Sequence, residues 1–115
     1  MRVGAVCKTV ALALALSASR VAAQASDGQA IYRSECKLCH GINGVPPKSA
    51  GAKYKKLKSL GDSGFVTTLS VDSIVTILKN GIDKDMKSFK SKLAEAELRA
   101  VAVYIKELAA KRKPA

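Results

Sequence analysis

Apolar residues recur at helical spacing in two long segments of the chain. In the first segment they lie three or four positions apart, at Val71, Ile74, Val75 and Leu78. Ser70 precedes this stripe as a helix-capping residue, and Asn80-Gly81 follows it as a pair that favours a left-handed stop. The pattern predicts a helix over 71–80 with one buried face.

The second segment lies near the C-terminus and repeats this spacing over a longer stretch. Its apolar residues are Leu98, Val101, Ala102, Ile105 and Leu108. The charged residues between them are expected to face away from the stripe: Glu97, Arg99, Lys106 and Glu107. We therefore predict a closing amphipathic helix, followed by a basic tail at the end of the chain.

The remaining segments after residue 25 show weaker patterns. Ser26 and Gln29 fit a capping box, which predicts a first helix from Asp27. Residues 41–64 are rich in Gly, Pro, Ser and Lys and should form a long loop with a short helix near 54–60. Residues 82–92 are polar and irregular apart from Met86 and Phe89. Because the alternation typical of strands is absent, we predict an all-α domain.

The first 25 residues differ from the rest. Arg2 and Lys8 supply a positive start, a short apolar run follows, and small residues precede a cleavage point after Ala23 or Ala25. This order is typical of a secretory signal peptide, and the run is too short to span a bilayer. We expect residues 1–25 to be a signal peptide and residues 26–115 to form one periplasmic domain, without stable membrane insertion after cleavage.

Composition limits how this domain can be stabilised and what it can bind. Loss of residues 1–25 removes Cys7 and leaves 17 Lys and Arg against nine Asp and Glu, a net charge of about +8. About 90 residues with no Trp, two Phe and three Tyr make a thin core, which often needs a cofactor or a cross-link. The positive excess of an exported domain favours an acidic protein partner over nucleic acid.

The segment ECKLCH, residues 35–40, contains the two remaining cysteines and the only histidine. At helical spacing, Cys36, Cys39 and His40 fall within one sector of the turn. C-x-x-C-H is the attachment pattern of c-type haem. The two thiols would form thioethers with the porphyrin vinyl groups, and the His40 imidazole would bind the iron. One covalently bound haem c would also compensate for the thin core.

Three other interpretations of this segment are chemically possible. A thioredoxin-like redox pair would need a βαβ context, which the pattern does not show. A structural disulfide between Cys36 and Cys39 could form after export, but it leaves His40 without a role. Zinc would need a fourth ligand that the sequence does not obviously supply. The haem interpretation accounts for all three residues together.

A second axial ligand of the iron has one candidate in the exported domain. Met86 is the only methionine after residue 25, and it lies in the polar segment between the two long predicted helices. There a loop could place its thioether on the opposite face of the haem. Histidine and methionine together give a raised reduction potential, which suits electron transfer. The alternative is a methionine that fills a gap or lies on the surface.

With these residues placed, the chain resembles the class I c-type cytochromes, specifically the small bacterial periplasmic ones. The resemblance rests on GQAIYRSECKLCHGING and on LKNGIDKDMKSFKSKLAEAELRAVAVYIKEL, which together cover most of the exported domain. It implies a small cytochrome c-like fold of three to five helices around one covalently bound haem. It also implies that the first and last helices cross at Gly28, Tyr32, Val101 and Tyr104.

Three details of the family pattern concern this site. In the family a proline carbonyl after the motif usually accepts a hydrogen bond from the ligand histidine, and Pro46 and Pro47 are the candidates. Lys87 stands where the family commonly has a proline after the methionine, which predicts a looser loop. Ala94 stands where a Ser or Thr often caps the closing helix, which removes a cap worth about 1 kcal/mol.

The resemblance implies an electron-transfer protein rather than an enzyme: a one-electron carrier between periplasmic redox partners with acidic docking faces. The candidate docking lysines are Lys37, Lys84, Lys87 and Lys90. The lysines of the long loop are expected mainly to keep it in water: Lys53, Lys55, Lys56 and Lys58. Two alternatives remain open, namely a dedicated haem subunit of a periplasmic dehydrogenase complex and a gas-binding haem protein with an absent or easily displaced methionine.

Overall fold

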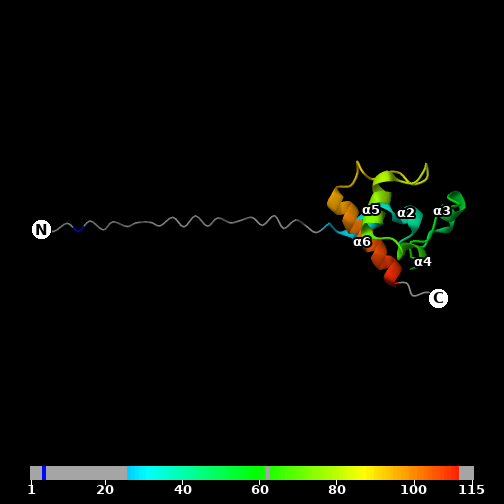
Figure 1. Cartoon of the computed structure of the whole chain (residues 1–115), viewed down its shortest axis with the longest axis horizontal. Coiled ribbons are helices and arrows are strands. Elements are labelled where there is room, and N and C mark those ends of the chain that lie inside the picture. The colour runs from blue at the N-terminus through cyan, green and yellow to red at the C-terminus, as the bar shows by residue number, and fades with distance from the viewer. Residues whose placement is uncertain (1–3, 5–25, 62, 112–115) are drawn as a thin grey trace.

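A computed structural model describes residues 4, 26–61 and 63–111 of the chain. The predicted signal peptide, apart from Gly4, lies outside these residues, as do Cys7, both candidate cleavage points and residues 112–115 of the tail. The described residues contain six helices (Figure 1): α1 Gly28–Glu35, α2 Lys37–His40, α3 Lys48–Lys53, α4 Ser63–Val66, α5 Val71–Asn80 and α6 Glu95–Lys111.

The all-α prediction is confirmed for the described residues, which contain no strand beyond one isolated antiparallel bridge between Ile82 and Met86. The six helices exceed the expected three to five because α2 and α4 have four residues each. A single turn is too short to show helical periodicity in a sequence. Figure 1 shows α2 and α3 close together on one side of the α5–α6 pair.

Helix α1 begins one residue later than predicted, because Asp27 rather than Ser26 is its N-cap. The Asp27 carboxylate accepts hydrogen bonds from the backbone N–H groups of Gln29 at 3.0 Å and Ala30 at 3.2 Å. Asp27 has the extended backbone of a capping residue, with φ −78° and ψ 96°. A carboxylate at this position therefore satisfies two of the free N–H groups that a helix start leaves.

Helix α5 has both predicted ends. The Ser70 hydroxyl accepts a hydrogen bond from the Ser73 N–H at 3.0 Å, and Gly81 ends the helix with φ 70°. Ile74, Val75 and Leu78 are buried as the stripe predicted, and Val71 packs partly buried against the same core.

Helix α6 carries the predicted buried stripe, made by Leu98, Val101, Ala102, Ile105 and Leu108. Ala94 supplies no side-chain cap, but the Glu97 carboxylate accepts a hydrogen bond from its N–H at 2.7 Å, which keeps one half of a capping box. Lys106 differs from its expected outward position. It is half-buried and donates a hydrogen bond to the carbonyl of Leu69, so it links α6 to the segment before α5.

Helices α1 and α6 cross at the four predicted positions. A Cβ atom on Gly28 would lie 2.2 Å from the carbonyl oxygen of Ala100, so the two backbones touch there. The rings of Tyr32 and Tyr104 pack at 5.4 Å between centroids with a tilt of 59°, a favourable edge-on arrangement. Tyr32 and Val101 have no exposed surface. The crossing therefore forms the centre of the core.

The predicted short helix near 54–60 is wrong. The helix in this loop is α3, which starts after Pro47 and ends before Tyr54. Ala50 buries its side chain in this helix. A helix over 54–60 would place Lys55 and Lys58 three residues apart on one face, where like charges repel. The alanine-containing segment before the lysines is thus the better helix.

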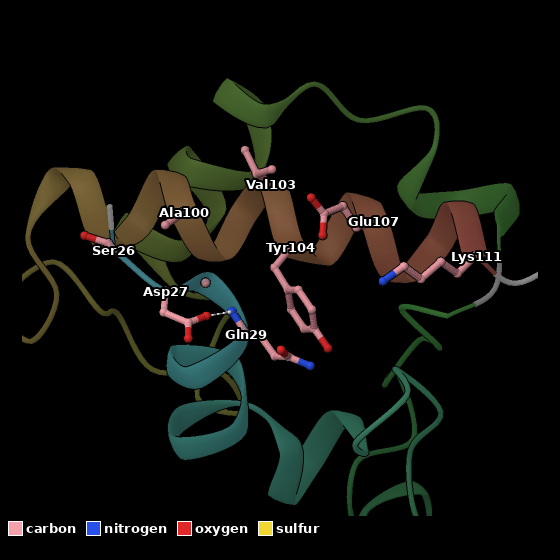
Figure 2. A pocket seen from close by; sticks show the side chains of 9 residues that line it. Ser26, Asp27, Gln29, Ala100, Val103, Tyr104, Glu107 and Lys111 are labelled. Carbon is pink, nitrogen blue, oxygen red and sulfur yellow. Dashed lines mark hydrogen bonds between the residues drawn. The ribbon is translucent and has the colours of Figure 1, made fainter. Parts of the chain in front are cut away.

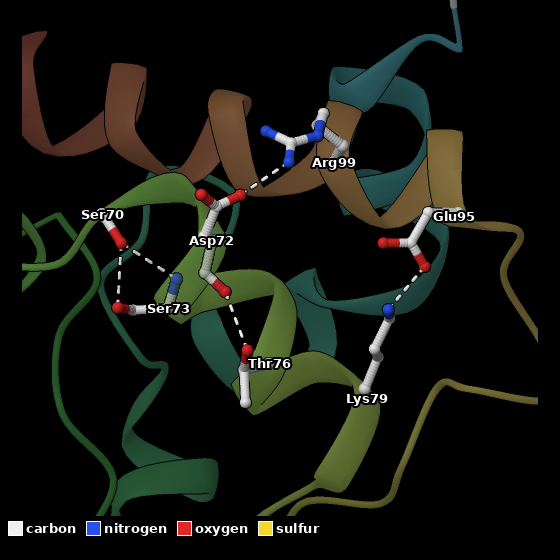
Figure 3. A network of polar contacts seen from close by, with 7 residues as sticks. All are labelled: Ser70, Asp72, Ser73, Thr76, Lys79, Glu95 and Arg99. Carbon is white, nitrogen blue, oxygen red and sulfur yellow. Dashed lines mark hydrogen bonds and ion pairs between the residues drawn. The ribbon is translucent and has the colours of Figure 1, made fainter.

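Ion pairs on the surface connect α5 with α6 (Figure 3). Arg99 pairs with Asp72 at 2.6 Å, and Lys79 pairs with Glu95 at 2.6 Å. The Thr76 hydroxyl also donates a hydrogen bond to the Asp72 carbonyl at 3.0 Å, within α5. Because these side chains are largely solvated, each pair is worth at most about 1 kcal/mol. They fix the register of two helices whose attachment comes from the core.

A shallow surface groove follows the α1–α6 crossing (Figure 2), with Gln29, Tyr104 and Lys111 among its lining residues. In Figure 2 the Tyr104 ring points from α6 toward α1. The residues of the cysteine motif do not line this groove. Within the described ranges, no helix is long and apolar enough to cross a membrane.

Candidate functional site

The cysteine motif forms a helical turn of its own at the end of α1. Cys36 has φ −115° and ψ −32°, which ends α1 and starts α2 at the same residue. The Cys36 carbonyl accepts hydrogen bonds from the N–H groups of Cys39 at 3.3 Å and His40 at 2.9 Å. The helical spacing used to predict a common sector therefore holds from Cys36 to His40.

The two cysteines are free thiols in this structure, which does not support a structural disulfide. Burial, with smaller contributions from Glu35 and Cys39, raises the pKa of the Cys36 thiol to about 11. A redox-active cysteine needs the opposite shift, toward thiolate. Among the described residues, no group of three or more His, Cys, Asp or Glu side chains could hold a metal ion. The zinc and thioredoxin-like interpretations therefore lose support.

His40 lies half-buried at the end of the turn, and its Nδ1 atom is buried without a hydrogen-bond partner. Burial lowers the pKa of His40, so the imidazole is neutral at physiological pH and has a lone pair to donate. Two thiols and one neutral imidazole on a single turn are the donor set that thioether attachment and iron ligation need. The residues present thus fit a covalently bound haem.

The hydrogen bond expected between His40 and a proline carbonyl is absent, because Nδ1 has no partner. The chain turns back sharply after the motif, with φ 77° at Gly41 and φ 79° at Gly44. A Cβ atom on Gly41 would lie 1.8 Å from the Val45 carbonyl oxygen. This turn brings the Val45 carbonyl, rather than that of Pro46 or Pro47, against the end of the motif.

The loop that follows the motif is held from two directions. The buried Tyr32 hydroxyl donates a hydrogen bond to the Gly41 carbonyl at 2.7 Å, and burial is the main reason why the pKa of Tyr32 is raised. The Gly44 carbonyl accepts from the Gly61 N–H and from the Ser59 hydroxyl, each at 3.0 Å. Hydrogen bonds from helix α1 and from residues 59–61 therefore hold the backbone that follows His40.

Met86 lies in a loop that is more restrained than its sequence predicts. Ile82 and Met86 exchange two backbone hydrogen bonds, at 2.8 and 3.1 Å, across a turn in which Asp83 has φ 48°. The Phe89 N–H donates to the Leu78 carbonyl at 2.9 Å, which ties the loop to the end of α5. These bonds restrain the loop in place of the proline that Lys87 replaces. The Met86 side chain is half-buried and packs against the core.

Charged residues on both sides of Met86 influence the pKa values of Glu35, just before the cysteine motif, and of Lys53, at the end of α3. The pKa of Glu35, which precedes Cys36, is lowered mainly by its hydrogen bond to Lys92 and also by Lys87. The pKa of Lys53 is raised mainly by Tyr54, with further contributions from Cys39 and Asp85. The 2.6 Å ion pair between Lys92 and Glu35 gives the direct contact: it joins the segment after Met86 to the residue before Cys36.

Sequence reasoning missed two contributions of the lysines near this site. Lys92 pairs with Glu35 at 2.6 Å, a contact between segments that no local pattern connects. Lys53 and Lys58 are exposed but also lie over aromatic rings, with Nζ 5.1 Å from the Tyr54 ring centroid and 4.6 Å from the Phe65 ring centroid. The Lys58 contact links the loop to α4 as well as leaving the charge in water, whereas Lys53 contacts only its neighbour in the chain.

The chain also matches known proteins over most of its length. Residues 23–105 match the family described as cytochrome c oxidase, cbb3-type, subunit III. A cytochrome c6-like protein of Nostoc sp. (strain PCC 7120) is 34% identical over 85 residues, which are 74% of this chain and 71% of the Nostoc protein. Cytochrome c6 of Synechocystis sp. (strain PCC 6803) is 31% identical over 98 residues, 84% of this chain and 75% of that protein.

A solved structure agrees with the fold. The KustC0563 c-type cytochrome superposes with a TM-score of 0.64 at 26% identity, covering 71% of this chain and 96% of the solved one. The family match and these similarities imply covalently bound haem c. The chain therefore belongs to the c-type cytochrome family, as a small class I c-type cytochrome.

Proposed function

We propose that this protein is a monohaem one-electron carrier, with the haem attached through Cys36 and Cys39 and the iron bound by His40 and Met86. The observation that carries the proposal is the convergence at the site. Two thiols and a neutral imidazole share one turn, and the Glu35–Lys92 ion pair ties the segment after Met86 to the residue before that turn.

The haem, when bound, supplies reversible exchange of one electron at the iron. The chain's own residues hold the two proposed ligands, His40 and Met86, in position. The Tyr32 and Gly44 hydrogen bonds hold the backbone around His40, and the Ile82–Met86 pair holds the loop of the second ligand. With both ligands held in this way, the coordination would stay the same in both oxidation states, and little would have to rearrange at each transfer. This arrangement suits a carrier.

We place the carrier in the periplasm, as residues 26–115, after removal of residues 1–25 as a signal peptide. The pattern of charged start, short apolar run and small residues supports export. Covalent attachment suits an exported domain because the haem cannot be lost by dissociation. Its partners would be a donor and an acceptor protein, whose identities the proposal leaves open.

The first test is the chemistry of the pigment. The exported protein should be coloured, its haem should stay with the polypeptide in acidified organic solvent, and its pyridine haemochrome spectrum should show two thioether links. A colourless protein, or pigment that the solvent extracts, would overturn the assignment of Cys36 and Cys39. Mass spectrometry of the same sample gives an independent check, because the intact chain should carry the added mass of one haem.

The second test is electrostatic steering of the partner. Electron transfer from a negatively charged donor should slow several-fold between low and physiological ionic strength, because salt screens the net charge of about +8. Lys37, Lys84, Lys87 and Lys90 are all exposed and available for docking. Stopped-flow rates against ionic strength check this, with an uncharged donor as control. Equal slopes for the two donors would leave the lysines as solubilising groups only.

A second candidate function, a dedicated haem subunit of a redox complex, is favoured by two observations. The matching family is described as an oxidase subunit, and Leu38 and Ile42 beside the cysteine motif are 79% and 55% exposed. Apolar side chains so placed could contact a permanent partner. Purification from the native source separates the two functions: a carrier elutes alone, whereas a subunit stays with a larger enzyme.

A further inference from the structure

One ion pair connects the two halves of the proposed ligand set. Lys92 lies beyond Met86 in the chain, and its Nζ is 2.6 Å from a carboxylate oxygen of Glu35, the residue before Cys36. The Glu35 side chain is 19% exposed and that of Lys92 is 49% exposed. Partial burial of the carboxylate weakens competition from water and makes this pair stronger than a fully solvated one.

The segment between Met86 and Lys92 can transmit this restraint. Phe89 is buried, its N–H donates to the Leu78 carbonyl, and its own carbonyl accepts from the N–H of Lys92 at 3.0 Å. The Ser88 hydroxyl donates a hydrogen bond to the Lys79 carbonyl. Hydrogen bonds at Ser88, Phe89 and Lys92 thus connect Lys92 to the ordered segment that carries Met86.

The position of this pair differs from that of the other ion pairs among the described residues. Asp72–Arg99 and Lys79–Glu95 both join α5 to α6 (Figure 3), and neither includes a residue of the cysteine motif or of the methionine loop. Glu35–Lys92 joins the helix that leads into the motif to the loop that holds Met86. The backbone bonds of the loop, by contrast, connect it to itself and to α5.

We propose that Glu35 and Lys92 are positioning residues, whose ion pair holds the methionine loop against α1 and thereby keeps the Met86 thioether on the iron. This inference rests on the proposed function, because it needs Met86 as a ligand. Without the pair, the loop keeps its attachment to α5 but can move away from the motif. The Met86–iron bond then opens more often, while the fold and the haem remain.

Competition with imidazole for the ferric iron of the haem-loaded protein measures this opening. Glu35→Gln and Lys92→Gln should each raise the apparent affinity for imidazole by about threefold, within the range that one partly solvated ion pair supplies. The double variant should show the same increase as either single one, because both changes remove one contact. Asp72→Asn is the matched control: it breaks an equally short ion pair that joins α5 to α6 without involving the motif or the methionine loop, and it should leave the imidazole affinity unchanged.

Each outcome decides the matter. An unchanged imidazole affinity in both single variants overturns the proposal, and so does a double variant whose effect is the product of the two. An increase in Asp72→Asn as large as in Glu35→Gln would show that general loosening of the fold is responsible, which also overturns it. Met86→Ala tests the assignment of Met86 as a ligand separately from the role of the ion pair. If this variant has an unchanged imidazole affinity, Met86 is not the ligand and both proposals fall.

Discussion

Replacing Met86 with alanine is expected to lower the reduction potential by on the order of 0.1–0.3 V, within the roughly 0.8 V that axial ligands span. The thioether favours the reduced iron, and its loss removes that preference. The weak sulfur-to-iron absorption at the red edge of the oxidised spectrum should vanish in the same variant. Redox titration and visible spectroscopy of the haem-loaded protein measure both effects.

Ile82→Ala is the matched control for this change. Ile82 is 51% exposed and contacts Met86 through backbone hydrogen bonds, which the substitution retains. Its spectrum and potential should therefore stay close to those of the unmodified protein. Carbon monoxide adds a second readout: it should bind the reduced Met86→Ala variant at neutral pH but not the unmodified protein. Binding to both would instead favour a gas-binding haem protein with a displaced methionine.

The parts of the fold that the sequence predicts well are those fixed by local chemistry. The Ser70 cap, the apolar stripe and the Gly81 stop of α5 lie within one short segment, and each acts on its own neighbours. The same holds for the turn from Cys36 to His40. Where two local signals compete, prediction is weaker: Asp27 displaced Ser26 as the cap of α1 because its carboxylate reaches two N–H groups.

The errors in the loop have a different cause. Residues 41–64 contain few apolar positions, so periodicity could not decide between α3 and a helix near 54–60. The burial of one small side chain, Ala50, favours α3, and the repulsion between lysines disfavours a helix near 54–60. Contacts of this kind depend on what the rest of the domain places beside the loop. A single sequence does not show them.

The geometry around the candidate ligands was also beyond the sequence. Cys36, Cys39, His40 and Met86 follow from residue types and motif spacing alone. The absent proline contact of His40 and the closed loop of Met86 depend on backbone angles at Gly41, Gly44 and Asp83. The Glu35–Lys92 pair depends on how two distant segments meet. Motif spacing thus predicts which residues take part, and tertiary packing decides what holds them.

Gly28→Ala is expected to lower the free energy of unfolding by about 1–3 kcal/mol, the usual cost of forcing atoms into a packed contact. The added Cβ would lie 2.2 Å from the Ala100 carbonyl oxygen and 2.7 Å from its carbonyl carbon. Both are backbone atoms of α6, so no side chain can move aside. The helices would have to separate at the crossing where Tyr32 and Tyr104 pack.

The sign of this effect identifies its cause, because the same substitution usually stabilises an exposed helix by up to about 1 kcal/mol. Gly51→Ala in α3 is the matched control, since a Cβ atom there would meet nothing within 4 Å. Thermal unfolding of the haem-loaded variants should show Gly28→Ala melting roughly 4–8 °C lower for each kcal/mol lost, and Gly51→Ala unchanged or slightly higher. If both variants gained stability, α1 and α6 would not be in contact at Gly28. The crossing could then not be what holds α1, and the cysteine motif at its end, in position.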